Sequence, residues 1–134
     1  MSYQPPGTSV RADIIDLATV LYPTLIGVAA RPVTARNANI SYSDLCARLT
    51  GRWQGLHYRD PRLNDALGYL VARCRAAGLP AISSVVINYS FRHPGNAYFI
   101  VAHPEAGDDE DLRLIAWGKE CTAAHAANYP ATVP

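Results

Sequence analysis

Long uninterrupted apolar runs are absent from this sequence of 134 residues. Runs such as residues 85–87 and 97–102 are far shorter than the roughly 20 residues that a membrane-spanning helix needs. Residues 1–7 are polar and contain two prolines, without the basic and then apolar pattern of a secretory signal. We therefore expect a cytoplasmic protein that makes no contact with membranes.

Cysteine is scarce as well. Cys46, Cys74 and Cys121 lie far apart without C-x-x-C spacing, so we expect buried thiols that behave as small apolar side chains. A zinc site that combines them with His57 or His125 stays open, but ligand spacing gives it no support. No metal and no cofactor is predicted.

Motifs for catalysis are also missing. The sequence contains no G-x-G-x-x-G, no Walker loop and no H-E-x-x-H. The four histidines are not followed at a suitable spacing by a nucleophile and an orienting acid, and Ser83-Ser84 lacks a nucleophile elbow. No catalytic residue is predicted, and an enzyme is only the third reading of the function.

The composition is that of a folded chain, with 49% hydrophobic and 17% charged residues, and its length suits a single domain over residues 1–134. The net charge is +1, but basic and acidic residues are concentrated in different parts of the sequence. Between residues 31 and 93 nine arginines face three aspartates, a local charge of +6, whereas from residue 94 onward two basic residues face six acidic ones, a charge of −4. This asymmetry favours a basic binding surface; the alternative is a set of arginines that only solvate one face.

A helical segment is predicted over residues 9–30. Ser9 caps a helix over residues 10–22, in which Ile14, Leu17, Ala18 and Leu21 form one apolar face. Pro23 ends or kinks this helix because it lacks an amide proton. Alternatively, Pro23 opens a second short helix over residues 24–30.

Two helices follow in the middle of the chain. Residues 40–51 form a short helix, with Ser41 and Asp44 as a variant capping box. Residues 61–77 form a longer one, because Asp60-Pro61 is a helix start and Gly78 a helix end.

A β-hairpin is predicted next. Residues 81–88 are rich in β-branched side chains and read as a strand, residues 89–96 contain turn chemistry at Pro94-Gly95, and residues 96–103 read as the returning strand. Arg92 and His93 would then lie at the tip. A final helix over residues 110–127 begins with a cap at Asp108 or Asp109.

The order helix, turn, helix and hairpin is typical of a winged helix. The expected fold is therefore α+β and winged-helix-like over residues 39–103, with added helical segments at 9–30 and 108–127. In such modules the second helix enters the DNA major groove while basic side chains contact phosphates.

We accordingly expect duplex DNA binding by a basic helix and wing, with Arg62 and Asn64 placed to read bases. A homodimer is compatible with this interpretation, because such modules often pair across two half-sites. The expected nucleic-acid-binding residues are Arg52, Arg59, Arg62, Asn64, Arg73, Arg75 and Arg92.

The alternative is a protein-binding adaptor or inhibitor. Tyrosine and arginine are enriched at the centres of protein interfaces, and Tyr42, Tyr58, Tyr89 and Tyr98 are expected on the open side of the module. The residues that this alternative assigns to the partner are Tyr58, Arg59, Arg92 and His93.

Residues 40–45, Ile-Ser-Tyr-Ser-Asp-Leu, and the Ala66-Leu67-Gly68 pattern resemble the winged-helix-like C-terminal domain of the alkylguanine-DNA alkyltransferase-like proteins. The resemblance covers about 60 residues and implies a DNA-binding module. The Pro-Cys-His-Arg motif of that family is replaced here by Gly78-Leu79-Pro80-Ala81, so alkyl transfer to a cysteine is not expected.

Residues 74–82, together with residues 85–88 and Pro94-Gly95, also resemble small uncharacterised proteins of bacterial and phage mobile elements. That resemblance implies no established activity. It adds to the protein-binding alternative a role in phage–host conflict, directed at a host defence protein.

Overall fold

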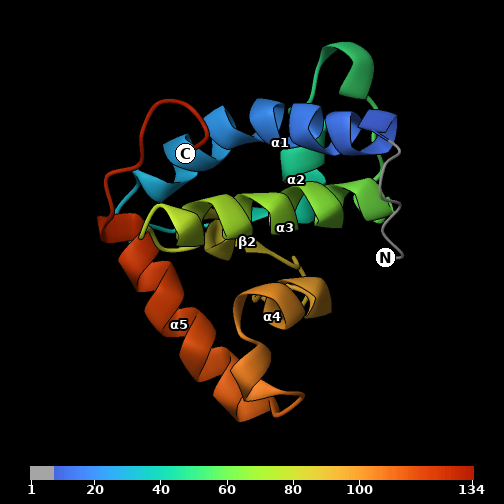
Figure 1. The fold of residues 1–134 in the computed structure, drawn as a ribbon. Coiled ribbons are helices and arrows are strands. Elements are labelled where there is room, and N and C mark those ends of the chain that lie inside the picture. The colour runs from blue at the N-terminus through green and yellow to red at the C-terminus, as the bar shows by residue number, and fades with distance from the viewer. Residues whose placement is uncertain (1–7) are drawn as a thin grey trace.

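A computed structural model describes residues 8–134, and in that part of the chain the fold is α+β and mostly helical. Helices α1 (Thr8–Ala29) and α3 (Pro61–Ala76) lie side by side, α4 (Asn96–Ala102) packs against α3, and α5 (Glu110–Ala126) extends away from one end of the pair (Figure 1). The remaining elements are helix α2 (Tyr42–Ala47), the 3-10 turns η1 (Gly51–Trp53), η2 (Ile82–Val85) and η3 (Pro104–Ala106), and the strands β1 (Ile40–Ser41) and β2 (Val86–Ile87).

α1 continues through Pro23, so the prediction that the helix stops or restarts there was wrong. An internal proline removes one backbone hydrogen bond and costs about 3 kcal/mol. Leu17, Leu21 and Leu25 are fully buried on one side of the helix, and each such side chain contributes about 1.5–3 kcal/mol. Burial on both sides of Pro23 therefore outweighs the local cost. The helix begins at Thr8, so Ser9, the expected cap, lies within the helix and does not precede it.

The main core lies where α1 packs on α3. The stretch Arg11–Ala29 of α1 is long and apolar enough, by length and composition, to cross a membrane. Here its apolar side chains share one cluster with Leu63 and Leu70 of α3 and with Val85 and Val86. The apolar character of α1 is therefore explained by its place in the core of a small domain.

The two long helices that follow confirm their sequence signals. The predicted helix 61–77 is α3, capped by the Asp60 carboxylate and ended by Gly78 with a φ of 71°. The predicted helix 110–127 is α5, and Asp109 is its cap, accepting the Leu112 N–H. Caps of this kind act locally, which is why sequence alone located these ends.

α2 is shorter than the predicted helix 40–51. Ser41 caps it as expected, since Ser41 Oγ accepts the Asp44 N–H at 3.1 Å, but the helix ends at Ala47. The chain then turns so that Leu49 and Trp53 both become buried. Gly51 does adopt a left-handed φ of 64°, but there it begins η1 and does not end α2.

The predicted β-hairpin was wrong. Residues 81–88 form η2 and the two-residue strand β2, and β2 pairs in parallel with β1, with Ile40 opposite Val86. Residues 96–103, expected to be the returning strand, form α4 and its C-cap His103. The structure therefore has no hairpin wing within residues 8–134, and Arg92 and His93 lie in the turn between β2 and α4.

The returning segment is helical because of where its apolar side chains have to go. Tyr98, Phe99 and Ala102 are buried, whereas Ile100 and Val101 are exposed. That spacing suits one face of a helix and not the alternation of a strand. Short apolar runs fit either pattern until the packing partner is known.

Candidate binding surface

A hollow lined by tyrosines lies where three separate segments meet. Tyr42 and Ser43 come from α2, Tyr58 from the connection between η1 and α3, and Tyr89 from the turn after β2. The hollow has a volume of about 250 Å³. Asn88 and Ser90 complete its lining.

Residues 88–93, here named the aromatic loop, are held in one conformation by hydrogen bonds within the loop. The Asn88 side-chain oxygen accepts the N–H groups of Ser90 (2.9 Å) and Phe91 (3.2 Å). The Asn88 N–H donates to the His93 carbonyl, and the Arg92 N–H donates to the Asn88 carbonyl, both at 2.8 Å. This closure is tight enough that Arg92 adopts a left-handed φ of 64°, a conformation uncommon outside glycine.

His93 fixes the loop to α4. Its Nδ1 donates to the carbonyl of Pro94 at 2.7 Å, because a carbonyl can only accept. The His93 ring also stacks on Phe91 and contacts the edge of Phe99. Phe99 is a buried residue of α4, so the loop is anchored to the core.

This ordered loop points two aromatic rings into solvent. Tyr89 is 72% exposed and Phe91 is 70% exposed. Exposed aromatic rings on a preorganised loop lose little conformational freedom when a partner covers them. Phe91 was missed in the sequence, where the only signal was an apolar residue within the polar segment Asn-Tyr-Ser-Phe-Arg-His.

Two arginines lie on the tyrosines of the hollow. The guanidinium of Arg59 lies 5.7 Å from the ring centre of Tyr58, and that of Arg92 lies 6.0 Å from the ring centre of Tyr89. Within the described residues neither Arg59 nor Arg92 has a carboxylate oxygen within 4.0 Å. His57 stacks on Tyr58 as well, at 4.6 Å between ring centres.

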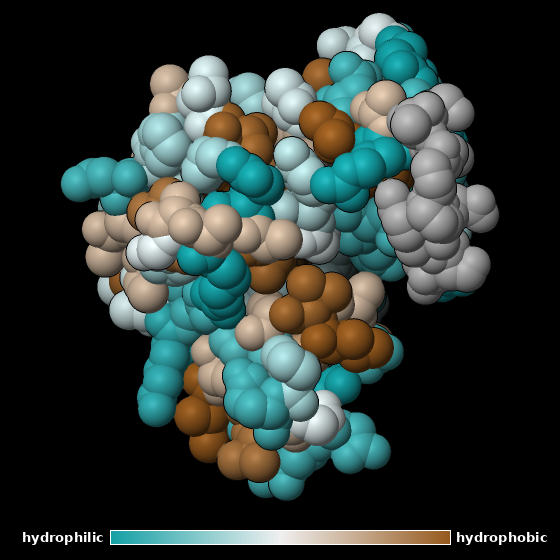
Figure 2. All heavy atoms as spheres, in the orientation of Figure 1, coloured by the Kyte–Doolittle hydropathy of each residue, from teal (hydrophilic) through white to brown (hydrophobic). Residues whose placement is uncertain are grey.

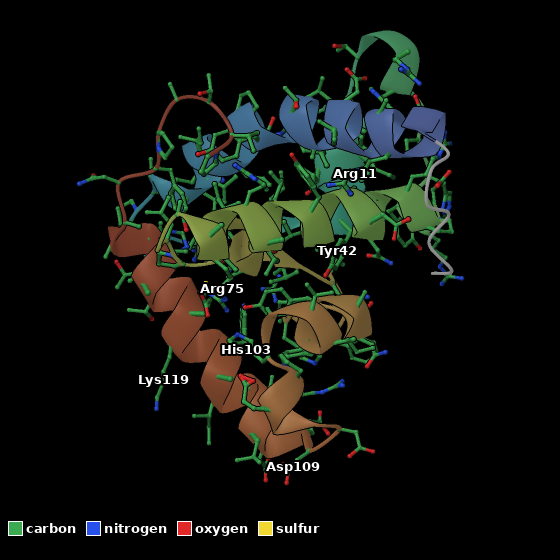
Figure 3. The ribbon with its side chains drawn as sticks, viewed as in Figure 1. Arg11, Tyr42, Arg75, His103, Asp109 and Lys119 are labelled. Carbon is green, nitrogen blue, oxygen red and sulfur yellow. The ribbon has the colours of Figure 1, made fainter. Side chains whose placement is uncertain are left out.

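Tyr42 is the half-buried tyrosine of the hollow, and it has a structural role. Its hydroxyl accepts the N–H of Gly95 at 2.8 Å, which ties α2 to the turn before α4 (Figure 3). Burial raises the pKa of Tyr42, so the hydroxyl stays neutral. The tyrosines expected on an open side are thus split, since Tyr58 and Tyr89 are exposed, Tyr42 is half-buried and Tyr98 is buried.

The other residues expected to bind nucleic acid engage protein groups. Arg52 pairs with Asp13 at 2.7 Å, and Arg62 pairs with Asp60 at 2.9 Å. The hydrogen bond from Arg62 is the largest cause of a lowered pKa at Asp60.

The remaining members of that set lie further along α3. Arg73 donates to the Pro134 carbonyl at 2.7 Å, and Arg75 pairs with Glu120 at 2.6 Å. Asn64 lines a cavity of about 20 Å³ between α3 and α4. Of the seven predicted residues, Arg59 and Arg92 are the two that lie on tyrosine rings of the hollow within the described residues.

A buried polar network connects α3, α4 and α5. Ser84 Oγ is hydrogen-bonded to Tyr98 OH (2.8 Å), and Tyr98 OH to His103 Nε2 (3.1 Å). Glu120 accepts two hydrogen bonds from Arg75, at 2.6 and 2.9 Å, and a third from the Ala81 N–H at 2.7 Å. Figure 3 shows Arg75 and His103 in the space between these helices.

This network holds helices together and does not present a nucleophile. Ser84 is fully buried and its hydroxyl bonds a tyrosine, not the histidine. Burial raises the pKa of Tyr98 well above its usual range, so its proton is retained. In residues 8–134 no group of three or more His, Cys, Asp or Glu side chains is arranged to hold a metal ion.

Comparison with known proteins identifies no relative: no protein-family model matches the chain, and neither the curated proteins nor the solved structures include a significant match. The resemblances to alkyltransferase-like proteins and to mobile-element proteins stay predictions from the sequence.

Proposed function

We propose that this protein is a non-enzymatic binding domain whose partner is a protein, and that the partner binds at the aromatic loop and the tyrosine hollow. The observation that carries the proposal is an ordered loop that exposes Tyr89 and Phe91, with Arg92 on the Tyr89 ring and Arg59 on the ring of Tyr58 in the same hollow. Aromatic residues and arginine dominate the energetically important centres of protein interfaces. Four residues assigned to a partner from the sequence, Tyr58, Arg59, Arg92 and His93, lie in or beside this surface.

Binding of duplex DNA stays a prediction with less support. A helix that reads DNA needs several free cations to neutralise phosphates, and Arg52, Arg62 and Arg75 are each paired with a carboxylate. A cytoplasmic location, a homodimer and a role in phage–host conflict also stay predictions.

A second exposed apolar surface provides a matched control. Figure 2 shows apolar side chains over α4 and over the outer part of α5. Leu112 and Ile115 of α5 are about half exposed, and neither lines the tyrosine hollow or the hollow next to the aromatic loop, so replacing them removes exposed apolar side chains outside the proposed site.

The test compares Tyr89→Ala/Phe91→Ala with Leu112→Ala/Ile115→Ala. Each variant is used to capture proteins from a lysate of the organism that encodes it, and any captured protein is purified and titrated calorimetrically. We expect a partner that binds wild type and the α5 variant equally and binds the loop variant at least about 30-fold more weakly, as for a hot-spot pair. An unchanged partner affinity in the loop variant refutes the proposal.

A second experiment, with nucleic acids, distinguishes a protein partner from a nucleic-acid partner. Fluorescence anisotropy with a labelled duplex and a labelled single strand, each at low and moderate salt, is measured on the same variants. Salt-dependent binding that is lost in Tyr89→Ala/Phe91→Ala would replace the protein partner with a stacked single strand. Duplex binding lost instead on Arg62→Ala or Asn64→Ala would restore the groove-reading hypothesis.

A further inference from the structure

We infer that the segment bound at the tyrosine hollow is an extended, acidic stretch of the partner protein, with a carboxylate paired to Arg59 or to Arg92. This inference rests on the proposed function and adds the chemistry of the partner. It follows from the charge around the hollow and from how the hollow continues on both sides.

The charged side chains in contact with the tyrosines of the hollow are basic. Its lining residues, Tyr42, Ser43, Tyr58, Asn88, Tyr89 and Ser90, include no acidic side chain. Arg59 and Arg92 lie over two of its tyrosine rings from different segments of the chain. A guanidinium that lies on an aromatic ring keeps its N–H edge free for a bidentate carboxylate.

The hollow is the middle of a longer track. It shares Ser43 and Tyr58 with a groove of about 500 Å³ that runs between α2 and η1. It shares Asn88 with a second hollow of about 500 Å³ that lies between the aromatic loop and the start of α5. Three connected depressions suit an extended segment of several residues better than a single side chain.

The far end of the track has more acidic than basic side chains. Asp108 and Glu110 line the hollow at the start of α5 together with one basic residue, Arg113, and like charges placed opposite one another are unfavourable. Acidic residues of the partner are therefore confined to the middle of the track, where the two arginines lie. The α5 end is expected to take neutral or basic residues.

The probe is a random 12-residue peptide library displayed on phage. Selection on wild type is followed by removal of phage that also bind Tyr89→Ala/Phe91→Ala. We expect the surviving peptides to share an Asp or Glu next to an apolar or aromatic residue. The consensus peptide is then synthesised, together with a version in which Gln or Asn replaces the acid.

Affinity measurements with the synthetic peptides test the arginines directly. Arg59→Gln/Arg92→Gln, and the amide version of the peptide, are each expected to weaken binding at least about tenfold, because a charge-assisted hydrogen bond is lost. Arg36→Gln/Lys119→Gln removes the same charge from exposed positions outside the hollow and is expected to change binding less than about twofold.

The other possible results of these experiments contradict either the acidic partner segment alone or the proposed function as well. Loop-dependent peptides without an acidic residue overturn the acidic partner but leave the proposed function standing. If no peptide depends on Tyr89 and Phe91 for binding, and no protein is captured from the lysate, both the acidic partner segment and the proposed function are refuted. Displacement of the peptide by an oligothymidylate at equal concentration identifies the hollow as a single-strand site and also overturns the inference.

Discussion

Replacement of Glu120 tests the polar network that joins three helices. We expect Glu120→Ala to lower the free energy of unfolding by about 3 kcal/mol. Its loss leaves the buried Ala81 N–H without an acceptor, which costs about 1–3 kcal/mol. Arg75 also loses its two hydrogen bonds to the carboxylate, but its side chain is 41% exposed, so water replaces most of that interaction and about 1 kcal/mol remains.

The same carboxylate gives the stability a defined pH dependence. Burial alone would raise the pKa of Glu120, but the hydrogen bonds from Arg75 and from the Ala81 N–H outweigh it and lower the pKa below the ordinary value of 4.5. The contribution is therefore complete above about pH 4.5 and is lost as the pH falls through the folded-state value. The difference in stability between wild type and Glu120→Gln should be constant near pH 7 and shrink towards about pH 3.

Urea unfolding followed by tryptophan fluorescence measures both effects, since Trp117 donates to the Ser84 carbonyl inside the network. Glu105→Gln is the matched control. Glu105 lies 3.4 Å from His103 but is 67% exposed, so its loss should cost less than about 0.5 kcal/mol. The reasoning would be refuted if Glu120→Ala lowered the free energy of unfolding by less than about 1 kcal/mol. It would also be refuted if the difference in stability between wild type and Glu120→Gln did not change with pH.

Three further predictions follow from single positions. Ser83 Oγ is buried without a hydrogen-bond partner among residues 8–134, so Ser83→Ala should leave thermal stability unchanged or raise it, whereas a loss above about 1 kcal/mol would reveal a bonded partner. Pro23 is exposed within α1, so Pro23→Ala should stabilise the protein by about 1–2 kcal/mol in urea unfolding, the restored helix hydrogen bond exceeding the entropy that proline removes from the unfolded chain; a destabilised variant would contradict this. The three cysteines are buried and form no disulfide, and burial raises the pKa of Cys121 to about 11. A thiol reagent at pH 8 should label none of them until urea is added, and rapid labelling of the native protein would show local opening.

Part of the proposed binding surface could be predicted from the sequence. Tyr58, Arg59, Arg92 and His93 were assigned to a protein partner because tyrosine and arginine recur in the polar segments that contain them. Phe91 was missed, because one apolar residue in a loop is indistinguishable from a core contact until its exposure is known. Sequence also gave no sign that Tyr58 and Tyr89 line one hollow.

The amino-acid sequence by itself determined where α3 begins and ends and where α5 begins. Asp60, Gly78 and Asp109 act on backbone groups within a few residues of themselves, so their effect does not depend on the rest of the fold. The burial of the cysteines followed in the same way from their apolar neighbours.

Only the tertiary structure decided the conformation of residues 96–103 and the state of the arginines. An apolar run is helix or strand according to the surface that it covers, and here that surface is α3. Arg75 and Glu120 are 45 positions apart, and Arg52 and Asp13 are 39 apart. Ion pairs at such separations exist because helix packing brings their ends together, so local sequence could count the charges but could not say which of them remain free.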